Sequence, residues 1–261
     1  MKEMTVMSIL EVRGLKKVYT TRFGGAHVQA LTDVTFTVEE GEYVAIMGES
    51  GSGKTTLLNI LAALDKPTSG DVLLDGKSLP SISERQLAAF RRDHLGFVFQ
   101  DFNLLDTFSI QDNILLPLVL AGTPYREMMN RLTPLAHQLG ITSLLKKYPY
   151  EISGGQKQRT AVARALITQP RLVLADEPTG ALDSKSTDSL LELFNEVNLQ
   201  GQTILMVTHS VKAASHAGRV LFIKDGMVFH QIYRGGCTLQ QMYQKISDTL
   251  TTLAAGGGED A

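Results

Sequence analysis

One glycine-rich segment, Gly48–Thr55, has the residue types and the spacing of a phosphate-binding loop. It fits the pattern G-x-x-x-x-G-K-[ST] between an apolar run, Tyr43–Met47, and a helical pattern, which argues against a glycine-rich turn that binds no ligand. Its glycines let backbone N–H groups turn inward around an anion, and the following helix adds the partial positive charge of its N-terminus. Lys54 would reach the β- and γ-phosphates of a nucleotide, and the Thr55 hydroxyl would ligate Mg²⁺. The residues predicted to hold the nucleotide are Gly48, Glu49, Ser50, Gly51, Ser52, Gly53, Lys54, Thr55 and Thr56.

Two adjacent carboxylates end a second apolar run. Leu172–Asp176 has the pattern of a strand buried on both faces, and Glu177 follows it directly. Asp176 stands where nucleotide hydrolases with a phosphate loop carry the acid that coordinates Mg²⁺, and Glu177 is placed to orient or deprotonate an attacking water. Two acids at the end of a buried strand are costly without a nearby cation, although a solvated strand end is the alternative. The pair therefore predicts metal-assisted hydrolysis at the carboxyl end of a strand.

His209 and Gln100 end two further predicted strands, residues 203–209 and 96–100. A lone histidine is more often structural than catalytic, but His209 ends the strand that follows the acid pair, which favours a place in the same site. A glutamine can contact Mg²⁺ or its water together with a neighbouring loop. Without the other motifs, a plain polar strand end would be the preferred interpretation of Gln100. We predict that both side chains act beside the acid pair.

A second candidate anion site begins at Ser153, where Ser-Gly-Gly-Gln precedes a predicted helix. Ser153 can cap that helix, and Gly154 and Gly155 permit close approach of the backbone, with Gln156 completing the motif. One nucleotide needs one phosphate loop, so the second site can complete the site of another copy of the chain. This is the hypothesis of a head-to-tail dimer with two nucleotides at its interface. An ordinary junction between a loop and a helix is the alternative.

The elements around these motifs predict an α/β chain. From residue 155 to residue 224, helical and strand patterns alternate, which implies a parallel sheet. Residues 8–40 show the period-two pattern of short strands, and helical segments containing several prolines between about 103 and 150 predict a helical lobe. The glycine-rich residues 256–261 are expected to be disordered. The alternating segments are helix 155–168, strand 171–175, helix 185–199, strand 203–207, helix 210–216 and strand 219–224.

The composition is that of an ordinary globular protein. Of 261 residues, 43% are hydrophobic and 20% are charged, and the net charge of −2 argues against a nucleic-acid partner bound through bulk positive charge. The single cysteine, Cys237, cannot form an intramolecular disulfide, which suits a reducing compartment. Lys2 and Glu3 lead into a mixed segment unlike a signal peptide. The longest apolar run, residues 114–122, is too short to span a bilayer, so a membrane role would come through a partner.

Together these motifs resemble those of the ATP-binding cassette (ABC) family, and the resemblance extends from about residue 8 to residue 233. Five motifs follow the family's order: the phosphate loop, the glutamine loop at Gln100, the signature, the acid pair and the histidine switch at His209. The signature has Ile152 before it, where leucine is more usual. By the same resemblance, Tyr19 matches the aromatic residue that stacks on adenine, and Asp183 lies in the loop after the acid pair.

The resemblance implies the fold and the assembly. The fold would be α/β, with a P-loop nucleotide-hydrolase core like that of RecA, an antiparallel β lobe and a helical lobe at about residues 101–165, in one nucleotide-binding domain over 1–255. The activity would be hydrolysis of ATP with Mg²⁺, each ATP being sandwiched between the phosphate loop of one copy and the signature of another. A separate membrane permease would be contacted by residues around 101–115, at the cytoplasmic face of a bacterial membrane, where the chain would be peripheral.

Two segments suggest a branch of the family. Residues 41–47 and 57–60 are similar to the branch that serves lipoprotein release, macrolide efflux and peptide-antibiotic resistance. Residues 100–107 and 112–118 look most like the bacitracin-type resistance transporters of Gram-positive bacteria. Lipoprotein release, macrolide efflux and cell-division signalling remain alternatives within the branch. A soluble cassette protein acting on ribosomes or DNA is disfavoured, because the chain has one cassette, no heptad run and no basic tract.

Overall fold

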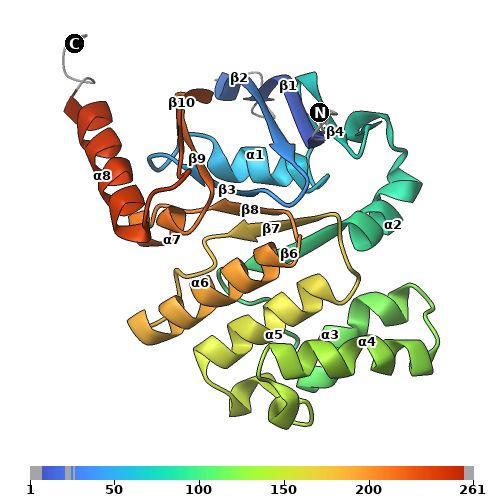
Figure 1. The fold of residues 1–261 in the computed structure, drawn as a ribbon. Helices are drawn as coiled ribbons and strands as arrows, with labels where there is room; N and C mark the ends of the chain where they lie inside the picture. Colours follow the sequence, from blue (N-terminus) through green and yellow to red (C-terminus); the bar gives the residue numbers. More distant parts are fainter. Residues whose placement is uncertain (1–7, 21–24, 26, 256–261) are drawn as a thin grey trace, which may run out of the picture.

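The structure, a computed structural model, describes residues 8–20, 25 and 27–255. Within these residues ten strands form one sheet in the order β5-β4-β1-β2-β10-β9-β3-β8-β7-β6 (Figure 1), which confirms the expected α/β fold. The expected disorder of residues 256–261 concerns a segment outside the described residues, and the domain bounds 1–255 stay a prediction. The strands are β1 (Ser8–Thr20), β2 (His27–Glu39), β3 (Tyr43–Met47), β4 (Ser69–Leu74), β5 (Lys77–Ser78), β6 (Leu95–Phe99), β7 (Leu172–Asp176), β8 (Ile204–Val207), β9 (Arg219–Lys224) and β10 (Met227–Tyr233).

The helices follow the predicted alternation, and the sequence analysis did not anticipate the last strand, β10, or the last helix, α8. Short 3₁₀ turns lie at Leu79–Ser81, Thr142–Leu144 and Pro149–Glu151. The α-helices are α1 (Lys54–Leu61), α2 (Glu84–His94), α3 (Ile110–Leu120), α4 (Tyr125–Gln138), α5 (Gly154–Leu166), α6 (Ser184–Leu199), α7 (Val211–Ser215) and α8 (Leu239–Ala255).

One end of the sheet is antiparallel and is built from β5, β4, β1 and β2. Residues 8–40, expected as short strands, contain two strands of 13 residues each, β1 and β2, which stay paired through several register shifts. Phe36 and Val38 are buried and alternate with exposed residues, as the period-two pattern predicts. A tight turn at Asp75 and Gly76, with φ angles of 54° and 74°, joins β4 to β5.

The other end is parallel, and β3 lies within it between β8 and β9. All five residues of β3 are buried. Val44 and Ile46 belong to a hydrophobic cluster with α1 and the antiparallel strands, whereas the alternate residues of β3 belong to a second cluster with α5, α6 and α8. A strand covered on both faces requires a continuous apolar run, and its burial fixes the start of the glycine-rich loop that follows.

Helices α3, α4 and α5 lie together, away from β1 and β2 (Figure 1). The loop that enters this group from β6 is held by two of them. Arg164 of α5 donates hydrogen bonds to the carbonyl oxygens of Phe102 and Asn103, and the fully buried Asn113 amide of α3 donates to the Leu105 carbonyl oxygen at 3.0 Å. The loop after Gln100 is thereby fixed to the helical group on both sides.

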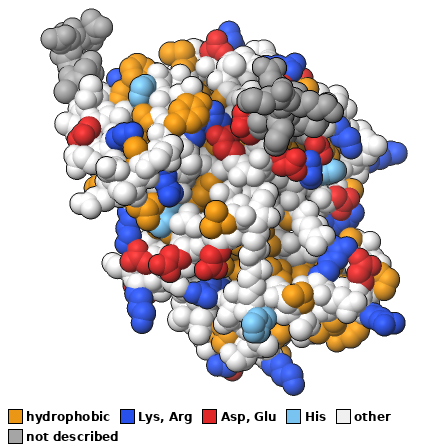
Figure 2. Space-filling model, in the orientation of Figure 1, with side chains coloured by type: hydrophobic (Ala, Val, Ile, Leu, Met, Phe, Trp, Pro, Cys, Tyr) orange, Lys and Arg blue, Asp and Glu red, His pale blue; other side chains and the backbone are white. Residues whose placement is uncertain are grey.

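The surface carries charges of both signs. Figure 2 shows acidic and basic side chains interspersed over one face, with hydrophobic side chains between them. No helix within the described residues is at once long enough and apolar enough to cross a lipid bilayer.

Gly96 in β6 lies directly against the helical group, and we expect Gly96→Ala to lower the free energy of unfolding by about 1–3 kcal/mol. A Cβ at this position would lie 2.5 Å from the Ala165 carbonyl oxygen and 3.1 Å from Pro170 Cγ, so the backbone would have to move. Urea unfolding measures the change. Gly236→Ala is the control because a Cβ there meets nothing within 4 Å. Equal urea midpoints for Gly96→Ala and the unmodified chain would contradict the prediction.

Candidate functional site

The glycine-rich loop begins at the end of β3 and leads into α1, as the sequence predicts. Two of its glycines lie where no side chain fits. A Cβ on Gly48 would lie 2.3 Å from the Ile223 carbonyl oxygen, and one on Gly53 would lie 2.4 Å from the Ala30 carbonyl oxygen. Gly53 also has a φ of 98°, in the left-handed region that favours glycine. The backbone is thereby folded tightly around the N-terminus of α1, where N–H groups are free to bind an anion.

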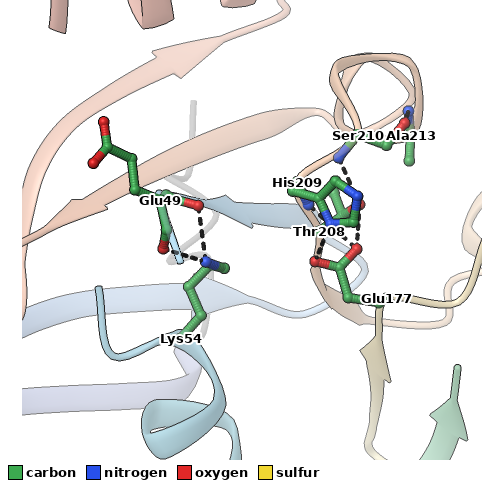
Figure 3. Close-up of polar contacts among 8 residues, drawn as sticks. Glu49, Lys54, Glu177, Thr208, His209, Ser210 and Ala213 are labelled. Atoms are coloured by element: carbon green, nitrogen blue, oxygen red, sulfur yellow. Dashed lines mark hydrogen bonds and ion pairs between the residues drawn. The ribbon is translucent and has the colours of Figure 1, made fainter. Parts of the chain in front are cut away.

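Lys54 lies at the start of α1 and curls back over the loop. Its Nζ donates hydrogen bonds to the carbonyl oxygens of Gly48 at 2.8 Å and Glu49 at 2.7 Å (Figure 3). Burial lowers the pKa of the Lys54 ammonium, although the charges of Glu177 and Asp176 act in the opposite direction. The ammonium is therefore held above the loop by two neutral acceptors, which a triphosphate can replace.

The acid pair, the glutamine and the histidine lie at the carboxyl ends of three adjacent strands, β7, β6 and β8. Asp176 pairs with Phe99 of β6 on one side and with Val207 of β8 on the other, so the residues that follow these strands are neighbours. Burial raises the pKa of the Asp176 carboxyl, the adjacent Glu177 charge raises it further, and Lys54 opposes both. Two acids in this setting favour a cation beside them.

Glu177 is held by the residues that follow β8. Its Oε1 lies 2.8 Å from His209 Nδ1, and its Oε2 accepts a hydrogen bond from Thr208 Oγ1 at 3.1 Å and from the His209 N–H at 3.3 Å (Figure 3). Glu177 has a φ of 44°, a left-handed conformation that is strained for a residue with a side chain. The carboxylate is therefore fixed in direction by the backbone and by two side chains.

A cavity of about 420 Å³ joins these groups. It is lined by residues of the glycine-rich loop, by the start of α1, by Glu177 and His209, and by residues 28–30 of β2. This volume lies in the range of small-molecule sites, roughly 300–1,000 Å³. The phosphate loop, Glu177 and His209, which are far apart in the sequence, thus face one space, whereas Asp176 and Gln100 are not among the described residues that line it.

Three other predicted residues, Tyr19, Gln100 and Asp183, are not among the described residues that line this cavity. Tyr19 lies on β1 with 41% of its surface exposed, so its ring is open to a ligand. Gln100 follows β6 and packs against Gly180, where an added Cβ would lie 2.9 Å from Gln100 Cδ. The Asp183 carboxylate accepts hydrogen bonds from the N–H and the hydroxyl of Ser186 and thereby caps α6. Those bonds lower the pKa of Asp183.

The signature residues cap α5 and do not line the phosphate-loop cavity. Gln156 N–H donates to Ser153 Oγ at 3.4 Å, and Ser153 N–H donates to Gln156 Oε1 at 3.0 Å, which is a capping box. A Cβ on Gly155 would lie 2.7 Å from Ser186 Oγ, so glycine is needed for the approach to α6. Among the residues that the structure describes, the cavity lining includes none of 153–156.

Two buried polar residues that the sequence analysis did not single out support the site. Thr208 donates to Glu177, as described, and is fully buried. Gln158 of α5 is also fully buried, and its Nε2 donates to the carbonyl oxygens of Phe99 at 3.3 Å and Pro178 at 2.8 Å. It thus joins the residue before Gln100 to the residue after Glu177. The sequence held one signal for Thr208, a polar residue inside an apolar strand pattern.

Known proteins are similar to this chain in both sequence and fold. The family described as "ABC transporter" matches residues 31–180. The chain is 49% identical to the ABC transporter ATP-binding protein YxdL of Bacillus subtilis (strain 168), over 97% of each chain. It is 46% identical to the bacitracin export ATP-binding protein BceA of Halalkalibacterium halodurans, over 95% of this chain and 97% of that one. It is 43% identical to the macrolide export ATP-binding/permease protein MacB of Rhodopirellula baltica, over 89% of this chain but 34% of that one.

A solved structure extends the comparison to a post-hydrolysis state. The dimeric post-hydrolysis structure of the ATP-binding cassette MJ0796, bound to ADP and Pi, superposes with a TM-score of 0.78 at 37% identity. The match covers 87% of this chain and 99% of that one. With the phosphate loop, acid pair and histidine gathered as described, the chain belongs to the ABC transporter family and is one of its ATP-hydrolysing, ATP-binding proteins.

Proposed function

We propose that this ATPase powers a separate membrane permease that removes or senses an antimicrobial peptide of the bacitracin type. The observation that carries the proposal is the 46% identity to a bacitracin export ATP-binding protein over nearly the whole chain. The similarity of residues 100–107 to that branch supports it, since this segment adjoins the surface that a permease would contact. Macrolide export is the second candidate, supported by the 43% identity to MacB, of which this chain spans about a third.

In the proposed reaction, Glu177 prepares water for attack on the γ-phosphorus of ATP. The water oxygen forms a bond to phosphorus, the bond from phosphorus to the β–γ bridging oxygen breaks, and ADP and phosphate result. The Glu177 carboxylate takes the water proton, and Thr208 and His209 hold its two oxygens in direction. Lys54 exchanges its two loop carbonyls for phosphate oxygens, so its charge offsets the negative charge of the triphosphate.

The residues present fit a bound Mg²⁺. Asp176 supplies a carboxylate whose raised pKa reflects burial beside a second acid, and Thr55 supplies an exposed hydroxyl at the start of α1. Magnesium is commonly held by one or two carboxylates together with substrate phosphates, so this small donor set is sufficient. Asp176, Thr55 and Gln100 would hold the ion. When bound, it would neutralise charge on the β- and γ-phosphates.

A second copy of the chain completes the site in this proposal. The signature caps a helix whose N-terminus can bind phosphate, yet it lies outside the cavity of its own chain. Two copies arranged head to tail would place each signature over the other copy's ATP. The dimeric form of the MJ0796 cassette supports this arrangement.

An apolar groove of about 630 Å³ is the proposed permease contact. It lies between α2, β6, α3 and α5, beside the loop after Gln100. Phe97 and Phe99 stack in it with ring centroids 5.8 Å apart, and Leu120 at its edge is 69% exposed. Three arginines also line it: Arg91, Arg92 and Arg164. An amphipathic helix of a permease, apolar on one face and acidic at its edge, would fit this groove.

We expect Leu120→Lys to reduce the permease recovered with the chain from native membranes at least about tenfold, because it removes an apolar contact and the added ammonium would lose water when the apolar face of the helix packs on the groove. Val119→Lys is the matched control: Val119 is 54% exposed on the same helix and does not line the groove. Mild-detergent extraction with mass spectrometry measures recovery, and basal ATPase activity reports on folding. Undiminished recovery with Leu120→Lys would exclude the groove.

The recovered partner also tests the substrate class. A permease with about ten spans and a large extracellular insertion supports peptide resistance. One with about four spans of near 20 residues each favours macrolide export, lipoprotein release or cell division. Recovery of the chain with no membrane partner would refute the permease proposal.

A further inference from the structure

Three residues outside the nucleotide motifs form a polar cluster around the ring of Tyr19. The Tyr19 hydroxyl donates a hydrogen bond to Asp65 Oδ2 at 2.8 Å. Lys17 Nζ donates to Asp65 Oδ1 at 2.6 Å and to the Lys66 carbonyl oxygen at 2.7 Å. The same Lys17 Nζ lies over the Tyr19 ring, 4.7 Å from its centroid. One face of the ring is therefore covered by a cation, and its edge is tied to a carboxylate.

The cluster joins two elements that are distant in the sequence. Lys17 and Tyr19 are two residues apart on β1 and so share one face of the strand. Asp65 follows the end of α1, where its N–H donates to the Asn59 carbonyl oxygen at 3.2 Å. The loop is attached to β1 again at Thr68, whose Oγ1 accepts from the Val18 N–H at 3.0 Å. Asp65 is thus anchored both to α1 and to the strand that carries the ring.

Hydrogen bonds and burial keep Asp65 ionised and Tyr19 protonated. Burial alone would raise the pKa of the Asp65 carboxyl, but hydrogen bonds from Lys17, Tyr19 and the Lys66 N–H outweigh burial and lower it, so the group stays ionised. Burial and the bond to Asp65 raise the pKa of the Tyr19 phenol, which therefore stays protonated and donates. The Lys17 side chain is only 12% exposed and that of Asp65 29%, so solvent screens this pair less than a surface pair.

We propose that Asp65 and Lys17 are positioning residues for the adenine base, which hold the Tyr19 ring in place with one face covered and the other free. A ring that is already fixed loses less freedom when a base stacks on it, so fixing it strengthens binding. Asp65 also follows α1, the helix that begins at Lys54 in the phosphate loop. The Tyr19 ring, which would stack on the base, and the loop that would bind the phosphates are thereby attached to the same helix. The inference rests on the stacking of adenine on Tyr19 that the resemblance to the family implies, and on the proposed hydrolysis of ATP.

Asp65→Asn tests the inference because it removes the charge and keeps the size. We expect the KM for ATP to rise about fivefold, with kcat changed less than about twofold, since a stacked base contributes mostly uniform binding. Tyr19→Phe keeps the ring, removes the tethered hydroxyl and should give the same rise. Binding of inorganic tripolyphosphate, which has no base, should be unchanged in both. Asp188→Asn is the matched control, because Asp188 pairs with Lys212 on the surface, 2.5 Å away.

The outcomes separate this inference from the proposal beneath it. Tyr19→Ala should raise the KM for ATP by roughly tenfold, and adding Asp65→Asn to it should change nothing further. An unchanged KM in Tyr19→Ala would refute the stacking role itself. A raised KM in Tyr19→Ala with a normal KM in Asp65→Asn would overturn the positioning role alone. Equal weakening of ATP and tripolyphosphate by Asp65→Asn would also overturn it, since Asp65 would then act on the phosphate loop.

Discussion

Glu177→Gln is expected to lower kcat for ATP hydrolysis by about 100- to 1,000-fold while ATP affinity changes less than about threefold. Glutamine keeps the size of the side chain and one of its two acceptor oxygens, so a bond from Thr208 Oγ1 or His209 can persist. It cannot take a proton from water at neutral pH. The strained φ of 44° at this position is no worse for glutamine than for glutamate. Steady-state phosphate release and equilibrium ATP binding measure the two quantities.

A control variant and the oligomeric state with ATP bound test the role of Glu177 further. Glu196→Gln, at an exposed acid on α6, should leave turnover unchanged. With hydrolysis blocked, ATP should hold two copies of Glu177→Gln together, and size-exclusion chromatography would detect the dimer. Near-normal turnover would remove Glu177 from the role of general base. A stable ATP-bound monomer would count against the shared site.

Lys54→Ala should weaken ATP binding and turnover together, with a loss in kcat/KM of about 1,000-fold or more. The Lys54 ammonium is bound to the Gly48 and Glu49 carbonyl oxygens. Among the described residues, no other lysine or arginine lines the cavity. Without it, the negative charge of the triphosphate would face Asp176 and Glu177 with no compensating side chain. The same kinetic and binding assays apply. Lys77→Ala, at an exposed lysine on β5, serves as control. Unchanged KM and kcat in Lys54→Ala would refute its contact with phosphate.

Local patterns predicted much of this fold. Helix 185–199 is found at Ser184–Leu199, and strand 96–100 lies at Leu95–Phe99, because each pattern depends on neighbouring residues alone. The same holds for the phosphate loop, in which Gly48 and Gly53 lie where a Cβ would clash with a neighbouring carbonyl oxygen. The gathering of Glu177 and His209 was predictable from the rule that parallel strands end at one edge.

Features that depend on distant residues were not predictable in this way. The 13-residue length of β1 and β2 arises from pairing across register shifts, which no single segment encodes. Helix α8 was missed because its burial depends on a neighbour: Met242 and Ile246 are fully buried in a cluster with residues from across the chain. Asp65 resembles any loop aspartate until its contact with Tyr19 is seen.

The place of β3 in the sheet sets the order in which a newly synthesised chain can become functional. Both strands beside β3, β8 and β9, belong to the last third of the chain, and Gly48 rests against the Ile223 carbonyl oxygen of β9. Helices α3 and α5 contact each other, and both precede β8 and β9 in the sequence. The group of α3, α4 and α5 can therefore form while the ribosome is still adding residues. Strand β3 therefore lacks both of its native neighbours until the last third of the chain has been made. The phosphate loop is synthesised early, but the strands that support it are synthesised late. We therefore expect ATP binding only in a chain that has been translated through β9.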